Sequence, residues 1–292
     1  MLKLRFAGPG AQAPDPLIDR PTGVHVWLNR QGGVVARGFR EAGFHWMAWP
    51  DLATYRFASD DPFITAYAVA GAPVDVIWDV YRRSVTPMAL QAFGWEALHA
   101  SAIVTDRGLI GFCATSETGK STVAYGLRRR GFPQWSDDGV VFRTEDAALA
   151  TPLPFEARLR PESRAMFGAD ARMLPGLKGN SPGEQRYTEP LPIALICLLK
   201  RVNGADDAPP LIRSAPPARA FPELLIHAHE FDPNDPERRA RMMQTYLDLA
   251  ARVPVVEINF VPNRDRLEAL LDVIVGELSL VVPDEANAAQ SA

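Results

Sequence analysis

The sequence predicts an α/β protein of the α+β kind, in which a small, mostly β region precedes a larger mixed domain. Short alternating segments with turn signals fill roughly the first 90 residues. From Ala97 the pattern changes to strand, turn, strand, glycine-containing loop, helix and strand, which is an α/β unit. We therefore expect a mostly β region at 1–94, a larger mixed domain at 95–282 and a disordered tail at 283–292.

The N-terminal region is expected to contain four strands followed by two short helices. Its alternating or β-rich stretches are Val24–Leu28, Gly33–Arg37, Thr54–Phe57 and Phe63–Ala70. After them, Pro73–Arg83 has apolar residues at helical spacing, and Pro87–Phe93 extends the helical pattern. These helices lead into the first strand of the larger domain.

The larger domain is expected to open with strands at Leu98–Val104 and Leu109–Cys113, joined by a turn. A helix at Ser121–Arg130 follows, ended by Gly131 and Pro133, and a further strand begins at Gln134. The later elements are expected to be a buried strand at Ile193–Leu199, an exposed turn region at Arg201–Pro217, a helix at Pro236–Arg252, a strand at Pro254–Val261 and a closing helix at Arg264–Leu280.

Bulk composition limits the partners, the cellular location and the cysteine chemistry that we expect. The chain has 292 residues, 47% of them hydrophobic and 23% charged, with a formal net charge of -4. This balance does not attract polyanions, so we expect no nucleic-acid partner. No stretch has the length and apolarity of a membrane span or a signal peptide, so we expect no membrane partner and a cytoplasmic protein. Cys113 and Cys197 lie in apolar runs and are expected to be buried thiols, not a disulfide.

The chemistry concentrates in the run Ala114-Thr-Ser-Glu-Thr-Gly-Lys-Ser121, which follows a predicted strand and precedes a predicted helix. This is the arrangement of a phosphate-binding loop, in which backbone N–H groups and a helix N-terminus bind phosphate. Lys120 then offsets phosphate charge, and the Ser121 hydroxyl is a ligand for Mg²⁺. The residues expected to bind the nucleotide are Thr115, Ser116, Glu117, Thr118, Gly119, Lys120, Ser121 and Thr122.

Two residues depart from the common pattern of this loop. Ala114 replaces a glycine, and alanine serves there if its φ is not positive. Glu117 would repel phosphate if its carboxylate pointed into the loop, so we expect its side chain to turn outward.

Polar residues on the strands that flank the loop add to the site. His99 lies on the strand before it, and Asp137 and Asp138 lie on the strand after the helix. Two neighbouring carboxylates can divide two tasks, because one stays ionised on a metal ion while the other, with a shifted pKa, acts as a general base.

Leu98-His99-Ala100, Gly119-Lys120-Ser121 and Ser136-Asp137-Asp138 resemble, at matching spacings, the catalytic domain of the HPr serine kinase/phosphorylase family, which is related in fold to phosphoenolpyruvate carboxykinase. The resemblance covers about Leu98 to Phe142. It implies ATP and Mg²⁺ as cofactors, Asp137 as the base that takes the proton of an acceptor serine, Asp138 as a metal-linked partner, and His99 as the residue that orients the pair. Classical members are oligomers, so a homo-oligomer is a further expectation.

This sequence also differs from the classical family. Thr115 stands where those enzymes carry an aspartate, and their later Glu-Ile-Arg-Gly-Leu-Gly signature is absent. We therefore expect a kinase without the phosphorylase reaction, acting on a serine or other hydroxyl of a peptide or protein; a ribosomal-peptide precursor is one candidate. Arg158 and Arg160 are candidates for binding phosphate or an acidic substrate, with ordinary surface arginines as an equal alternative.

Two other functions fit the same residues. A nucleotide-binding regulatory protein that has lost phosphoryl transfer would explain Ala114, Glu117 and the missing signature. A small-molecule kinase would use the N-terminal region to shape a pocket. The Asp137-Asp138 pair beside His99 favours an enzyme, because a nucleotide sensor has no need of a general base.

Overall fold

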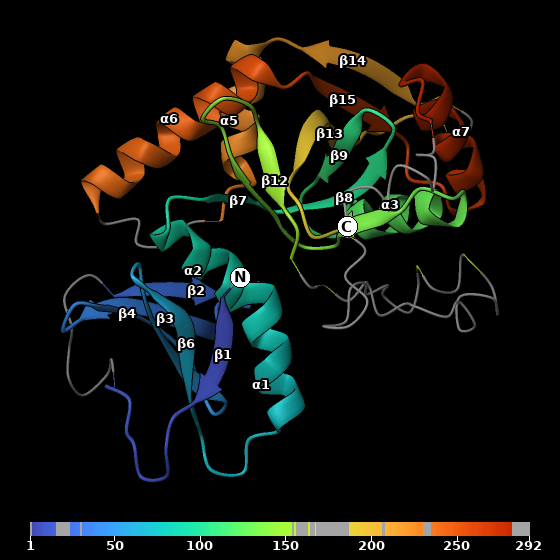
Figure 1. Cartoon of the computed structure of the whole chain (residues 1–292). Coiled ribbons are helices and arrows are strands. Elements are labelled where there is room, and N and C mark those ends of the chain that lie inside the picture. Colours follow the sequence, from blue (N-terminus) through green and yellow to red (C-terminus); the bar gives the residue numbers. More distant parts are fainter. Residues whose placement is uncertain are drawn as a thin grey trace. The chain divides into compact units, whose positions relative to one another are not determined.

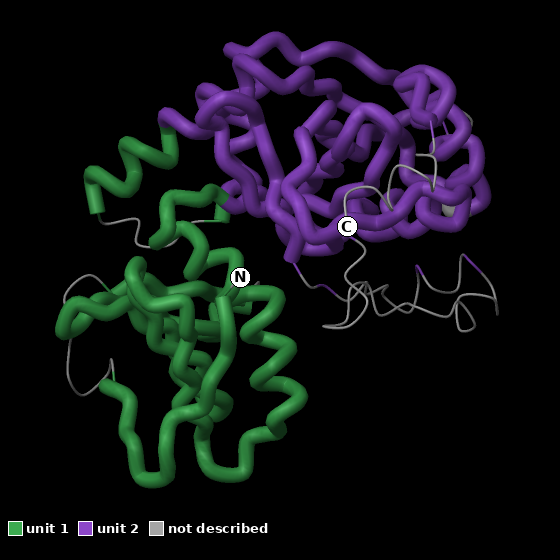
Figure 2. Tube along the Cα trace, in the orientation of Figure 1, with its two compact units in different colours: residues 1–96, 229–243 green, residues 97–228, 244–292 purple. Residues whose placement is uncertain are grey.

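The fold was analysed in a computed structural model of the 292-residue chain. The structure describes residues 2–15, 24–29, 31–153, 155, 163, 167, 187–205, 208–229 and 235–281. The expected tail at 283–292 and the candidate residues Arg158 and Arg160 lie outside these ranges. The chain is a mixed α/β protein with two compact units, one formed by residues 1–96 and 229–243 and the other by 97–228 and 244–292 (Figure 2).

The first unit contains a six-stranded sheet with the order β1-β6-β5-β4-β3-β2. Strands β2 to β6 form an antiparallel meander, and β1 adds in parallel to β6. The strands are β1 (Lys3–Phe6), β2 (His25–Leu28), β3 (Val34–Glu41), β4 (Phe44–Trp49), β5 (Ala53–Ala58) and β6 (Asp61–Ala68). The mostly β character expected here is observed, and β1 and β4 are strands that the sequence pattern did not reveal.

Helices α1 (Val74–Val80) and α2 (Thr86–Ala92) pack against this sheet, joined by a π-helical turn, η1 (Tyr81–Val85). The Tyr55 hydroxyl donates to the carbonyl of Ile77, 2.8 Å away, and both residues are fully buried. Tyr81 in turn donates to the carbonyl of Leu2 at 2.8 Å. The core of this unit is therefore a sheet face covered by the helices that the 3.6-residue pattern predicted.

The second unit is built on a nine-stranded mixed sheet. Its central strands run parallel, because β13 (Leu191–Arg201) pairs with β9 (Gly108–Cys113) on one side and with β15 (Val255–Phe260) on the other. The remaining strands are β7 (Glu96–Leu98), β8 (Ala100–Thr105), β10 (Gln134–Ser136), β11 (Val140–Arg143), β12 (Leu149–Thr151) and β14 (Leu211–Ala215). Since β9, β13 and β15 are parallel, their carboxyl ends lie at one edge of the sheet.

Helices α3 (Lys120–Arg129) and α7 (Leu267–Glu277) pack together over a core that includes Phe112 (Figure 1). Gly126 lies at this contact, where a Cβ would lie 2.5 Å from a Leu271 methyl group, so a larger residue there would need the Leu271 side chain to shift. Among the described residues, α5 (Pro217–Ile226) and the 3-10 turn η3 (Arg264–Arg266) also belong to this unit, and α6 (Pro236–Arg252) runs from the first unit into the second.

Three expectations about this unit were wrong in detail. The first predicted strand is two strands, β7 and β8, separated at His99. Residues Arg201–Pro217 were expected to be exposed turns, yet they contain β14, which pairs with β15 along five residues. The closing helix is shorter than Arg264–Leu280, because its first turn is the 3-10 turn η3.

Cys113 and Cys197 are buried free thiols, as expected. Burial raises the pKa of Cys113 to about 12. Both cysteines therefore serve as small apolar side chains in the strand core.

Candidate functional site

The predicted loop joins β9 to α3 at the carboxyl edge of the parallel strands. Gly119, immediately before the helix, has a φ of 118°, which an L side chain rarely adopts. Its carbonyl accepts the first helical hydrogen bond, from the N–H of Val123 at 2.9 Å. Ala114 is not among the described residues with positive φ, so alanine replaces glycine there without backbone strain.

Hydrogen bonds hold the loop from within and from a neighbouring strand. The N–H of Thr118 donates to the carbonyl of Thr115 at 3.2 Å, and the two threonine hydroxyls lie 2.9 Å apart. From the end of β13, Nε of Arg201 donates to the carbonyl of Thr118 at 3.1 Å. Glu117 has a φ of 71° and is exposed.

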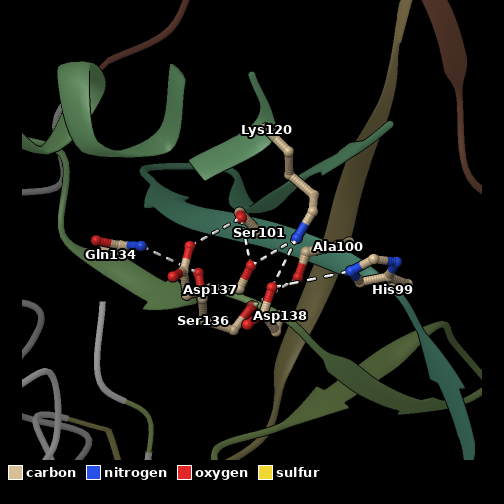
Figure 3. A network of polar contacts seen from close by, with 8 residues as sticks. All are labelled: His99, Ala100, Ser101, Lys120, Gln134, Ser136, Asp137 and Asp138. Carbon is tan, nitrogen blue, oxygen red and sulfur yellow. Dashed lines mark hydrogen bonds and ion pairs between the residues drawn. The ribbon is translucent and has the colours of Figure 1, made fainter. Parts of the chain in front are cut away.

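Lys120 connects the loop to the two aspartates (Figure 3). Its Nζ donates to the carbonyl of Asp137 at 2.9 Å and to Oδ1 of Asp138 at 3.2 Å. Nε2 of His99, at the break between β7 and β8, lies 3.8 Å from the same Asp138 oxygen. The structure thus brings together four residues that the sequence analysis had selected from three separate segments: His99, Lys120, Asp137 and Asp138.

The two aspartates have different surroundings. Asp137 is 4% exposed, and its carboxylate accepts a hydrogen bond from the Ser101 hydroxyl at 3.2 Å. The Asp138 side chain is 42% exposed. His99 and the nearby charge of Lys120 hold the pKa of Asp138 well below its usual range, although partial burial opposes this shift. Asp138 is therefore a carboxylate that stays ionised and is accessible to solvent.

A second polar network lies farther along the same edge. Nζ of Lys200 lies 2.8 Å from the Glu223 carboxylate and 3.0 Å from that of Glu257. Arg219 donates from Nε and Nη2 to the two oxygens of Glu257 at 3.0 and 2.8 Å. Glu257 is only 3% exposed, so this network satisfies a buried acid on the strand β15.

His227, at the end of α5, borders the site. Its carbonyl accepts a hydrogen bond from the N–H of His99 at 2.7 Å. Burial, together with the nearby His99, lowers the pKa of His227 to about 4. His227 is therefore a neutral, buried neighbour of His99.

Sequence reasoning missed residues that act through long-range contacts. Ser101 on β8 and Arg201 on β13 contact the site, yet neither belongs to a motif, and only the strand pairing brings them to it. In contrast, Ser121 could be selected from the sequence alone, because it directly follows Lys120. It lies in the first turn of α3 and is partly buried.

The donors present suit a hard cation, since Asp138 is ionised and Ser121 follows the loop lysine. Among the residues that the structure describes, no group of three or more His, Cys, Asp or Glu side chains could hold a metal by itself. A magnesium ion at this point would therefore need ligands from a substrate phosphate as well. Over the same residues, every helix is too short or too polar to cross a membrane.

Comparisons with known proteins give one distant likeness. No family model matches the chain, and no curated protein matches it. Among solved structures, the HPr(Ser) kinase/phosphatase from Coxiella burnetii is similar over 63% of this chain and 90% of that chain, with 14% sequence identity and a TM-score of 0.33. A similarity at this level concerns a distant structural relationship alone, and no statement about activity rests on it.

Proposed function

We propose that the protein is an ATP-dependent kinase, similar to HPr serine kinases, that transfers the γ-phosphoryl group to the hydroxyl of a serine in a peptide or protein. The observation that carries the proposal is the contact of Lys120 with both aspartates, at 2.9 Å from the Asp137 carbonyl and 3.2 Å from Asp138 Oδ1. Lys120 follows a glycine loop and contacts the backbone carbonyl of one aspartate and the carboxylate of the next. A loop lysine beside acidic side chains supplies the kinds of group that phosphoryl transfer needs.

The loop supplies phosphate binding in this proposal. Backbone N–H groups of the loop other than that of Thr118, together with the start of α3, would bind the phosphate oxygens, and Lys120 would move from Asp138 to the phosphates when ATP binds. Asp138 and Ser121 would hold Mg²⁺, which when bound neutralises phosphate charge. The low pKa of Asp138 supports this role, because the carboxylate needs no deprotonation before it binds a cation.

In the transfer step, the acceptor hydroxyl oxygen forms a bond to the γ-phosphorus. The bond between that phosphorus and the bridging oxygen of ADP breaks, and ADP leaves with the electron pair. The hydroxyl proton passes to Asp137, which acts as the general base. This role requires the Asp137 carboxylate to turn away from Ser101, because Asp137 is only 4% exposed. His99 keeps Asp138 in place through the contact at 3.8 Å.

The burial of Asp137 also favours a second candidate, a nucleotide-binding regulatory protein without phosphoryl transfer. If the Asp137 carboxylate stays with Ser101, it accepts no proton from an acceptor. The two candidates agree on ATP binding and differ only in transfer.

ATP binding is tested by calorimetry with Mg²⁺ on the wild type and on Lys120→Ala. We expect the variant to lose at least about tenfold in affinity, because a charge-assisted contact is worth about 1.5–3 kcal/mol. Lys3→Ala, which removes a lysine in the first unit, is the matched control and should bind as the wild type does. Equal binding by the wild type and Lys120→Ala would remove the loop from the nucleotide site.

Transfer is tested with ATP carrying a labelled γ-phosphate, offered with a library of serine-containing peptides and with small hydroxyl compounds. Asp137→Asn should retain ATP binding and lose about 10²–10⁴-fold in transfer. A wild type that binds ATP but labels no acceptor in either set supports the regulatory protein. Labelling of small compounds alone would replace the peptide acceptor in the proposal.

A further inference from the structure

Arg201 lies beside the phosphate loop without being part of it. It is the last residue of β13, whose Leu198 pairs with Cys113, the last residue of β9. The next residues of β13 therefore run alongside the start of the loop. The Nε of Arg201 donates to the carbonyl of Thr118 at 3.1 Å. This hydrogen bond holds the Arg201 side chain against the loop, at a residue two positions before Lys120.

Arg201 differs from its neighbour Lys200 in whether carboxylates pair with its charge. Lys200 lies between Glu223 and Glu257, at 2.8 and 3.0 Å, and is neutralised by them. In the described part of the chain, the guanidinium of Arg201 has no carboxylate partner, and its one hydrogen-bond acceptor is the Thr118 carbonyl. Arg201 is exposed and, as an arginine, always charged. The two amino groups at its end remain available as donors.

The sheet order places Arg201 and Lys120 on two sides of the loop. Strand β9 lies between β8 and β13. Lys120 contacts Asp137 and Asp138, which follow β10, the strand next to β8, whereas Arg201 comes from β13. An anion in the loop would therefore meet one cation from each side, of which only Lys120 belongs to the phosphate-loop motif.

We propose that Arg201 is a second phosphate-binding residue, whose guanidinium contacts the phosphate chain of the bound nucleoside triphosphate. The contact with Thr118 holds the planar guanidinium in place, so less side-chain entropy is lost on binding. Its remaining N–H groups match two phosphate oxygens, the geometry in which arginine binds anions most strongly. This inference rests on the proposed function, because it assigns a residue to the same nucleotide site.

The test separates the charge of Arg201 from its hydrogen bond to the loop. Arg201→Gln removes the charge and keeps an N–H donor, whereas Arg201→Lys keeps the charge and loses the planar fork. The matched control is Arg107→Gln. Arg107 is also exposed and donates to backbone carbonyls, those of Leu278 and Ser279, but it lies in the turn at the opposite end of β9.

Calorimetry with MgATP is carried out on these variants and on Lys120→Ala. We expect Arg201→Gln to weaken binding about tenfold or more and Arg201→Lys to weaken it less, with Arg107→Gln unchanged. If Arg201→Gln binds as the wild type does while Lys120→Ala loses affinity, Arg201 is only a loop contact and the inference is wrong. If the wild type binds no nucleotide, the proposed function itself fails. Thermal unfolding confirms that each variant is folded, and Arg201→Met offers a second charge-free variant with the same readout.

Discussion

Two ion pairs in this protein are built in opposite ways. In the first unit, the guanidinium of Arg238 contacts both carboxylate oxygens of Glu96, each at 2.7 Å, and the side chains are 8% and 4% exposed. In the second unit, Nζ of Lys120 contacts one oxygen of Asp138 at 3.2 Å, and the side chains are 9% and 42% exposed. The first pair is closed to solvent, and the second is open to it on the carboxylate side.

Under the proposed function, the difference separates a structural pair from one that exchanges a partner for a ligand. A buried bidentate pair satisfies its own charges and has no capacity to bind a ligand. A lysine that is paired with a half-exposed carboxylate can exchange that partner for a phosphate, since the carboxylate remains solvated when the lysine leaves. Under the proposed function, we therefore expect the open pair, and not the closed one, to take part in ligand binding.

The largest effect is expected from breaking the closed pair. Glu96→Gln leaves the Arg238 charge buried without compensation, and we expect the free energy of unfolding to fall by about 3–5 kcal/mol. Urea denaturation measures this loss. Glu268→Gln is the control, because Glu268 pairs with Arg130 on the surface, where its side chain is 67% exposed, and should cost under about 1 kcal/mol. Equal losses would contradict the distinction between the pairs.

The next effect concerns the support behind the open pair. Ser101 is fully buried and donates to the carbonyl and the carboxylate of Asp137. Ser101→Ala should lower the free energy of unfolding by about 1–3 kcal/mol, because it removes the buried hydrogen bonds of this hydroxyl to Asp137. Ser136→Ala, which removes a longer hydrogen bond of 3.4 Å to the Ala100 carbonyl, should cost less. A larger loss from Ser136→Ala would show that Ser101 does not hold Asp137.

His45 differs from both ion pairs, because packing removes this titratable group from water and keeps it neutral. Burial, with the nearby charge of Arg40, lowers its pKa to about 4, and its Nδ1 accepts a hydrogen bond from Arg40 at 3.3 Å, as only a neutral imidazole can. The unfolded state, with a pKa near 6.5, then binds more protons than the folded state between about pH 6.5 and pH 4. Stability attributable to His45 is therefore present above about pH 6.5 and is lost as the pH falls toward 4.

We expect this histidine to lower the free energy of unfolding by about 1–2 kcal/mol between pH 7 and pH 5. Urea midpoints across this range measure the slope, and His45→Gln should flatten it. His227→Gln allows the same measurement in the second unit, because the pKa of His227 is also about 4. An unchanged slope in His45→Gln would mean that His45 is not held neutral.

The sequence predicted what depends on local pattern. The loop between β9 and α3, the buried strand around Ile193–Leu199 and the helix at 236–252 follow from periodicity, glycine placement and capping signals. Ser101, Arg201 and the Glu96–Arg238 pair were missed, because their partners lie far away in the chain and depend on the order of strands in a sheet. Residue type alone does not reveal which serine or arginine reaches a loop.

The smallest change in stability is expected from opening the exposed pair. Asp138→Asn removes one partner of Lys120, yet the Asp137 carbonyl at 2.9 Å remains and solvent reaches position 138. We expect the free energy of unfolding to change by about 1 kcal/mol or less, while MgATP affinity and phosphoryl transfer fall. Asp79→Asn, which opens the partly buried pair of Asp79 with Arg83 at 3.4 Å in the first unit, is the control and should leave nucleotide binding intact. A stability loss in Asp138→Asn as large as that in Glu96→Gln would make the Lys120–Asp138 pair structural, because a pair built for exchange contributes little to the folded state before its ligand arrives.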